Sequence, residues 1–213
     1  MSEFRTAKPI DRAGVAAVIL AGGLARRMGG GDKTLLNVGG RPLLAHVIER
    51  LSPQVDRIML NANGDPARFG AFGLSVEPDP LEGFLGPLAG VLAGLRWAER
   101  IGARHVVSVA GDTPFFPTTL VNGLIAAAER TGTPLACAET DGRDHPTFGL
   151  WPVALADDLE TALRDEGLRK VVLWTEKHGC ARASFDAGPP DPFFNVNTPD
   201  DMAEAEAVLT AGA

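Results

Sequence analysis

The sequence contains only two cysteines among its 213 residues, Cys137 and Cys180. Neither has the spacing to other cysteines or histidines that is typical of metal ligands. A chain of this length can bury a substantial apolar core, so we expect it to need no disulfide. The scarcity of cysteine therefore favours a cytoplasmic protein.

Positive charge is not in excess either. The chain has 20 Lys and Arg against 27 Asp and Glu, which gives a formal net charge of −7. Proteins that bind nucleic acid non-specifically normally carry a basic surface, so no nucleic-acid partner is expected. A cluster of cations in this chain stands out against an acidic background and indicates a local anion site.

Long apolar runs are missing as well. No segment approaches the roughly 20 apolar residues that cross a bilayer, so no membrane partner is expected. No N-terminal signal sequence is visible, and the chain shows no internal repeat, low-complexity tract or linker. We therefore expect a disordered polar leader at residues 1–13 and a single domain at residues 14–213.

What the chain does contain is an alternation of short apolar runs with helical patterns. Strands are expected at 15–21, 57–60, 105–110, 135–138 and 148–151, and helices at about 42–51, 87–100 and 117–130. This alternation predicts a three-layer, Rossmann-like α/β fold with a mostly parallel central sheet and helices on both faces. Ligands of such folds bind at the carboxyl ends of the strands.

The first expected strand leads into a glycine- and cation-rich loop, and residues 15–34 read VAAVILAGGLARRMGGGDKT. Glycines let backbone N–H groups approach an anion closely, and Arg27 and Lys33 would neutralise it. A Walker A loop does not fit, because Asp32 and Arg27 stand where it needs glycine. No G-x-G-x-x-G follows the strand, which argues against a nicotinamide cofactor. The loop indicates a phosphate site, and the alternative is a turn with an exposed basic face.

An aspartate follows the strand at 105–110, in the string Gly111-Asp112-Thr113-Pro114. A carboxylate at the end of a central buried strand is costly to leave unpaired. Mg²⁺ would remove that cost, since it binds one or two protein carboxylates while phosphate and water complete its shell. Because the chain also has a phosphate loop, we favour Asp112 as a magnesium ligand over the alternative of a helix cap.

Polar residues also follow the second expected strand. Asn61 comes directly after it, and Asp79 stands between two prolines. An asparagine amide offers a donor and an acceptor to the edge of a nucleobase or sugar. On the sequence alone, turns explain both positions more simply. Asn63 is a weaker candidate of the same kind.

Two later strings carry further polar side chains. Arg143 and His145 lie in an expected loop at 141–147, where acid–base catalysis and a simple polar turn are equally good explanations. Asn195 and Asn197 share one face of an extended segment. Two amides on one face suit a ring-rich ligand or phosphate oxygens.

Together these strings resemble the molybdenum cofactor guanylyltransferases. The family's motifs occur in order over residues 14–208: L-A-G-G from Leu20, R-M-G from Arg27 followed by Lys33, G-P-L-A-G from Gly86, G-D-T-P from Gly111, R-D-H-P-T from Arg143 and N-V-N-T-P from Asn195. The resemblance implies a nucleotidyltransferase fold. It also implies an enzyme that transfers GMP from GTP to the terminal phosphate of molybdopterin and releases pyrophosphate. Proteins that deliver and accept the cofactor are plausible partners.

The resemblance assigns roles to residues of this chain. It implies a nucleotide-binding group made of Leu20, Ala21, Gly22, Gly23, Lys33, Asn61, Asp79 and Asp112. It implies that Lys33, Asp112 and Arg27 are catalytic and that Asp112 holds Mg²⁺. It places four residues on the side of the acceptor substrate: Arg143, His145, Asn195 and Asn197. Relatives that transfer CMP usually show L-A-A-G at residues 20–23, so the L-A-G-G of this chain favours guanine.

Two alternatives stay open. The first is a nucleotidyltransferase with another base or acceptor, such as CTP with molybdopterin or a sugar 1-phosphate. The second is a non-catalytic regulator that binds nucleotide. The N-V-N-T-P string argues against the sugar phosphate, and the presence of both Lys33 and Asp112 argues against the regulator.

Overall fold

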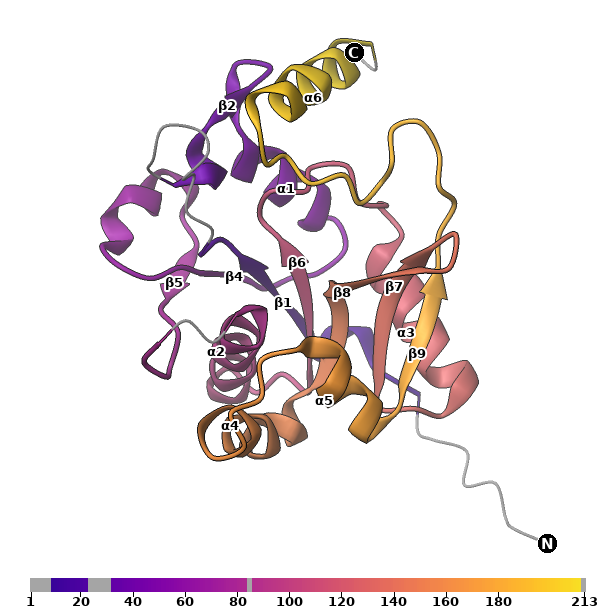
Figure 1. Ribbon diagram of the computed structural model, residues 1–213. Helices are drawn as coiled ribbons and strands as arrows, with labels where there is room; N and C mark the ends of the chain where they lie inside the picture. The colour runs from indigo at the N-terminus through magenta and orange to yellow at the C-terminus, as the bar shows by residue number, and fades with distance from the viewer. Residues whose placement is uncertain (1–8, 23–31, 84–85, 212–213) are drawn as a thin grey trace, which may run out of the picture.

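A central sheet of seven strands organises the molecule (Figure 1). The computed structural model describes residues 9–22, 32–83 and 86–211. The strand order is β5-β4-β1-β6-β8-β7-β9. The strands are β1 (Val15–Leu20), β4 (Ile58–Asn61), β5 (Ser75–Glu77), β6 (His105–Ala110), β7 (Leu135–Thr140), β8 (Arg143–Pro152) and β9 (Cys180–Ser184).

The sheet is mostly parallel. β1 pairs in parallel with β4 and β6, β4 pairs with β5, and β7 pairs with β9. Of the seven strands that the structure describes in this sheet, β8 alone runs antiparallel to its neighbours, β6 and β7. The carboxyl ends of β1, β4, β5 and β6 therefore meet at one edge of the sheet, where the sequence places its polar strings.

Helices cover both faces of the sheet, because successive residues of β1 are buried in two different cores. Ala17 and Ile19 point into a core shared with α1 (Leu43–Leu51) and α3 (Leu120–Thr131). Ala16 and Val18 point into a second core, formed with α2 (Pro87–Arg100), α4 (Ala156–Arg164) and α5 (Val171–His178). Figure 1 shows α2, α4 and α5 grouped on one side and α3 on the other. The predicted three-layer α/β fold is confirmed.

Helix α1 illustrates how the sequence forms these layers. Its apolar residues recur at helical spacing, and Leu44, Val47 and Leu51 are completely buried. Each such leucine contributes about 1.5–3 kcal/mol through burial alone. Pro42 directly precedes the helix, where its missing N–H costs no hydrogen bond.

The prediction of a loop at 141–147 was too long, because β8 already begins at Arg143. Asp141 and Gly142 form the turn between β7 and β8, with φ angles of 50° and 79°. Two successive positive φ angles are typical of a tight turn that joins antiparallel strands, and Asp-Gly is a favoured sequence for it. The Asp-Gly pair was therefore the signal for a hairpin at this point.

Short elements complete the fold around the sheet. They are η1 (Arg12–Gly14), η3 (Lys33–Leu35), β2 (Asn37–Val38), β3 (Arg41–Pro42), η4 (Pro66–Phe72) and η5 (Val153–Leu155). The last helix, α6 (Pro199–Ala211), packs beside β2 around a small core that includes Val38, Leu43, Val196 and Ala205. Within the described ranges, no helix is long and apolar enough to cross a membrane.

Candidate active site

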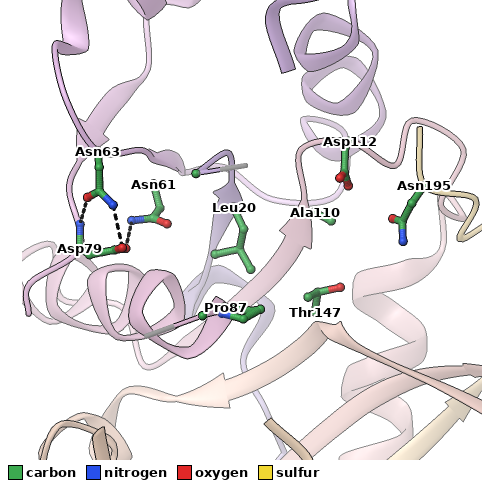
Figure 2. Close-up of a pocket in the computed structure, with 11 residues that line it drawn as sticks. Leu20, Asn61, Asn63, Asp79, Pro87, Ala110, Asp112, Thr147 and Asn195 are labelled. Atoms are coloured by element: carbon green, nitrogen blue, oxygen red, sulfur yellow. Dashed lines mark hydrogen bonds between the residues drawn. The ribbon is translucent and has the colours of Figure 1, made fainter. Parts of the chain in front are cut away.

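A cavity of about 350 Å³ lies at the carboxyl ends of β1, β4 and β6. Figure 2 shows Asn61, Asn63 and Asp79 on one side of it, Asp112 and Asn195 on the other, and Leu20 between them. The full lining is Leu20, Gly22, Asn61, Asn63, Asp79, Gly86, Pro87, Ala110, Asp112, Thr147 and Asn195. The cavity therefore has two polar ends, separated by the end of the central strand β1.

The first polar end is a carboxylate held by two amides. Asn61 Nδ2 donates to Asp79 Oδ1 at 3.0 Å, and Asn63 Nδ2 donates to Asp79 Oδ2 at 2.8 Å. The backbone N–H of Asp79 donates in turn to Asn63 Oδ1 at 2.8 Å. These bonds, drawn in Figure 2, fix the orientation of the Asp79 carboxylate. Asn63, the weaker candidate in the sequence, is as closely involved as Asn61.

The second polar end is built around Lys33 and Asp112. Lys33 Nζ lies 2.5 Å from Asp112 Oδ2 and also donates to Asn197 Oδ1. The Lys33 side chain is only 8% exposed, whereas that of Asp112 is 26% exposed and lines the cavity. Thr113 Oγ1 donates to Asn195 Oδ1 and lies 3.3 Å from Asp112 Oδ1. Residues from three distant parts of the chain thus form one charged cluster.

Backbone contacts hold this cluster in place. The N–H of Val196 donates to the Asp112 carbonyl at 3.0 Å, which anchors the segment carrying Asn195 and Asn197. Gly111 permits the close packing beside Asp112, since an added Cβ would lie 2.8 Å from Thr34 Cγ2 and 3.1 Å from the Leu20 carbonyl oxygen. A side chain at residue 111 would therefore push against Thr34 and the end of β1.

The residues predicted for the acceptor side separate into two groups. Asn195 lines the cavity and Asn197 contacts Lys33. Arg143 is exposed and His145 is buried, and neither lines the cavity; Thr147 from the same strand does. A substrate role for Arg143 and His145 stays a prediction. Sequence reasoning gave Thr147 no role, although it is the last residue of the R-D-H-P-T string.

His145 serves as a structural anchor in this arrangement. Its Nε2 atom lies 2.7 Å from Thr140 Oγ1, and its ring stacks on Phe193 with the centroids 4.2 Å apart. Burial lowers the pKa of His145 below its ordinary value, since it disfavours the charged imidazolium. The stack supports the segment that leads to Asn195 and Asn197.

The free energy of unfolding is expected to fall as the pH drops below about 6.5, the ordinary pKa of histidine. Because the pKa of His145 is lowered in the folded protein, the unfolded chain binds this proton first, and stability is lost between the unfolded and the folded pKa. Burial lowers the pKa of His105 too, so it adds to the same slope. Denaturant unfolding of the wild type and of His145→Gln at pH 7.5 and 5.5 measures the effect. An equal change in both proteins would contradict it.

The described residues offer one carboxylate rather than a cage for a metal. Across 9–22, 32–83 and 86–211, no group of three or more His, Cys, Asp and Glu could hold an ion. Asp112, whose side chain lines the cavity, still fits Mg²⁺, which prefers oxygen ligands and keeps places for phosphate and water. Gly23 and Arg27, which the sequence places in the nucleotide site, lie outside the described residues.

Comparisons with known proteins agree with this architecture. The family model described as "MobA-like NTP transferase domain" matches residues 17–179. The chain is 54% identical to the "Molybdenum cofactor guanylyltransferase" of Bradyrhizobium sp. (strain ORS 278), covering 90% of this chain and 92% of the relative. It is 52% identical to the protein of that name from Rhodopseudomonas palustris (strain BisB5), covering 93% and 95%.

A solved structure extends the likeness to three dimensions. The "Molybdopterin-guanine dinucleotide biosynthesis protein A" of Archaeoglobus fulgidus superposes with a TM-score of 0.71 at 26% identity. The match covers 92% of this chain and 99% of that one. The sequence motifs, the fold and these relatives lead to one assignment: the chain is a nucleotidyltransferase of the MobA-like family and belongs, within it, to the molybdenum cofactor guanylyltransferases.

Proposed function

We propose that this protein transfers GMP from GTP to the terminal phosphate of molybdopterin, which forms the guanine dinucleotide cofactor and releases pyrophosphate. The names of its relatives support this reaction. The strongest structural support for this reaction is that one cavity has two chemically different ends. The Asp79 carboxylate, held by two amides, suits a base, and the Lys33–Asp112 pair suits a phosphate chain.

The Asp79 end supports guanine as the base. A carboxylate has about four lone-pair positions, and Asn61 and Asn63 use one on each oxygen. One position on each oxygen remains, and these two match the N1–H and 2-amino donors of guanine. Cytosine presents the acceptors O2 and N3 on the corresponding edge and would be repelled. Gly22 is exposed, and no atom of residues 9–21, 32–83 or 86–211 lies within 4 Å of an added Cβ, so these parts of the chain leave space for a purine.

The Lys33 end supports phosphate binding. An ammonium group has three donors, and Asp112 and Asn197 accept two of those of Lys33. The third is proposed to reach the triphosphate. Asp112 is proposed to hold Mg²⁺, which would supply charge neutralisation at the phosphates when bound. Arg27 and Gly23 are proposed to complete the phosphate site, as the family's motif implies.

The reaction asks these residues for alignment and charge neutralisation. An oxygen of the acceptor phosphate attacks the α-phosphorus of GTP, and the bond to the pyrophosphate oxygen breaks. Two anions must approach each other, so a strong base contributes less than fixed positive charge. Asn195, on the cavity wall opposite Asp79, is proposed to face the acceptor (Figure 2). The delivering and accepting proteins and the cytoplasmic location stay predictions.

Pyrophosphate release tests this function. Purified protein is incubated with magnesium and molybdopterin, and GTP and CTP are supplied in parallel. Release with GTP alone supports the reaction and the base. Release with CTP alone would overturn the role proposed for Asp79. If protein that binds GTP releases pyrophosphate with neither nucleotide, molybdopterin is not the acceptor.

Gly90→Ala is expected to raise KM for GTP by about tenfold, which corresponds to one charged hydrogen bond. Gly90 lies on α2 where it faces β1 and β4, and an added Cβ would lie 2.6 Å from Leu20 Cδ2 and closer still to Asn61 Oδ1. Asn61 would then move away from Asp79. Steady-state kinetics with GTP measure the change.

Gly94→Ala is the matched control for this prediction. It adds the same methyl group one helical turn later, 2.8 Å from Val18 Cγ1. It is expected to lower the thermal unfolding temperature while KM for GTP stays within about twofold of the wild type. Equal KM values for the two variants would show that Asn61 does not act in nucleotide binding.

A further inference from the structure

Arg68 on η4 does not line the cavity, but it contacts Asn63 at one polar end and Asp32, which directly precedes Lys33 of the other. Its Nε atom lies 2.5 Å from Asp32 Oδ2, and its Nη2 atom lies 3.3 Å from Asp32 Oδ1. The same Nη2 atom donates to the Asn63 carbonyl at 2.5 Å, and Nη1 donates to the Asp65 carbonyl. One guanidinium group therefore joins the Asp32 carboxylate to the backbone of the turn at 63–65.

The contacts of Arg68 hold its guanidinium group on several sides. The side chains of Arg68 and Asp32 are 26% and 18% exposed, whereas those of the surface pair Arg41 and Glu49 are 51% and 65% exposed. The guanidinium carbon also lies 4.6 Å from the ring centre of Phe69, which is buried. A planar guanidinium that bonds on several sides and packs on a ring is held in one orientation.

The turn is shaped around this guanidinium. Gly64 has a φ of 87°, a conformation that other residues rarely adopt. A Cβ at Gly64 would lie 3.3 Å from Arg68 Nη1. The side chain of Asp65 accepts a hydrogen bond from the N–H of Ala67 and starts η4. The local sequence thus brings the Asn63 carbonyl against Arg68.

Each end of this bridge leads to a residue of the site. Asp32 directly precedes Lys33, whose ammonium group meets Asp112. Asn63 bonds the Asp79 carboxylate and its backbone N–H (Figure 2). Arg68 therefore connects the proposed base end and the proposed phosphate end through hydrogen bonds and an ion pair.

We infer that Arg68 is a positioning residue that sets the Asp79 carboxylate relative to Lys33, so that one nucleoside triphosphate satisfies both ends at once. The inference rests on the proposed function, in which Asp79 binds guanine and Lys33 binds the phosphates. Without the guanidinium, the turn at 63–65 shifts, and Asp79 no longer meets both donors of guanine. The selectivity for guanine then falls together with affinity.

The test compares the affinity for GTP with that for ITP, which lacks the 2-amino group. The wild type is expected to bind GTP about tenfold more tightly, as one charged hydrogen bond implies. Arg68→Gln is expected to bind GTP at least about fivefold more weakly and to reduce the GTP/ITP ratio to about twofold. Asp32→Asn is expected to reduce the ratio in the same direction. Titration calorimetry with magnesium measures the affinity of each protein for GTP and for ITP, and no acceptor substrate is needed.

Arg96→Gln is the matched control. Arg96 is 27% exposed and pairs with Asp157 and Glu160 away from the cavity. Its loss is expected to lower the unfolding temperature and to leave the GTP/ITP ratio unchanged. Arg68→Lys, which keeps the charge but not the planar group, is expected to restore part of the ratio.

The outcomes separate this inference from the proposed function. An unchanged GTP/ITP ratio in Arg68→Gln and Asp32→Asn would overturn the positioning role, even if both variants are less stable. A wild type that binds GTP selectively but transfers no GMP would overturn the proposed reaction. The GTP/ITP affinity ratio of the variants would still test the positioning role of Arg68. A wild type that does not prefer GTP over ITP would overturn both.

Discussion

Asp112→Asn is expected to lower kcat for GMP transfer by about 10³-fold, the upper range for losing one group that stabilises transition-state charge. The variant keeps the size of the side chain but removes the charge that is proposed to hold Mg²⁺. The Asp112 side chain pairs with Lys33 and lines the cavity. Initial rates at saturating GTP and molybdopterin measure the loss.

Asp144→Asn controls for the general effect of removing a carboxylate. The Asp144 side chain is 25% exposed, close to the 26% of Asp112, and it also forms an ion pair, with Arg182. It does not line the cavity. Transfer by Asp144→Asn is expected to stay within about twofold of the wild type. Comparable rates for the two variants would show that Asp112 is not catalytic.

Lys33→Met is expected to lower kcat/KM for GTP by about 10²- to 10³-fold, as losing a preorganised donor to developing charge does. Methionine fills most of the space of the buried lysine stem but brings no charge to the phosphates. Asp112 would also lose its neighbouring cation, so repulsion of the triphosphate increases. Steady-state kinetics over a range of GTP concentrations separate kcat from KM.

Lys33→Arg and Lys177→Met complete this experiment. Arginine restores the charge with a different shape and is expected to recover only part of the activity. Lys177 on α5 is about half exposed and pairs with Asp158 on α4, so its loss is expected to leave transfer unchanged. Turnover by Lys33→Met within about threefold of the wild type would remove Lys33 from the mechanism.

Most of the fold could be predicted because local patterns determine it. The apolar run at residues 15–21 and the string ending at Asp112 indicated buried parallel strands with polar ends, and β1 and β6 are adjacent in the sheet. The strand at 148–151 was predicted, but its antiparallel direction was not, since a strand buried on both faces has the same apolar pattern in either direction. The Asp141-Gly142 pair was the one local signal for its reversal.

The candidate site was predictable where it depends on strand ends and less so where it depends on contacts across the chain. Lys33 and Asp112 were expected around one phosphate site, and the structure brings them into contact. The bond between Asn63 and Asp79 spans 16 residues, and that between Asp32 and Arg68 spans 36 residues. No spacing in the sequence encodes such pairs, because they depend on how η4 and the turn before it fold back on the sheet.

The transfer of GMP itself is tested most directly by following the α-phosphorus. The protein is incubated with molybdopterin, magnesium and GTP labelled at the α-phosphate, and the products are separated. The expected result is label in a pterin–guanine dinucleotide and unlabelled pyrophosphate. Label that stays in GTP, or that appears only as free GMP, would contradict the proposed function.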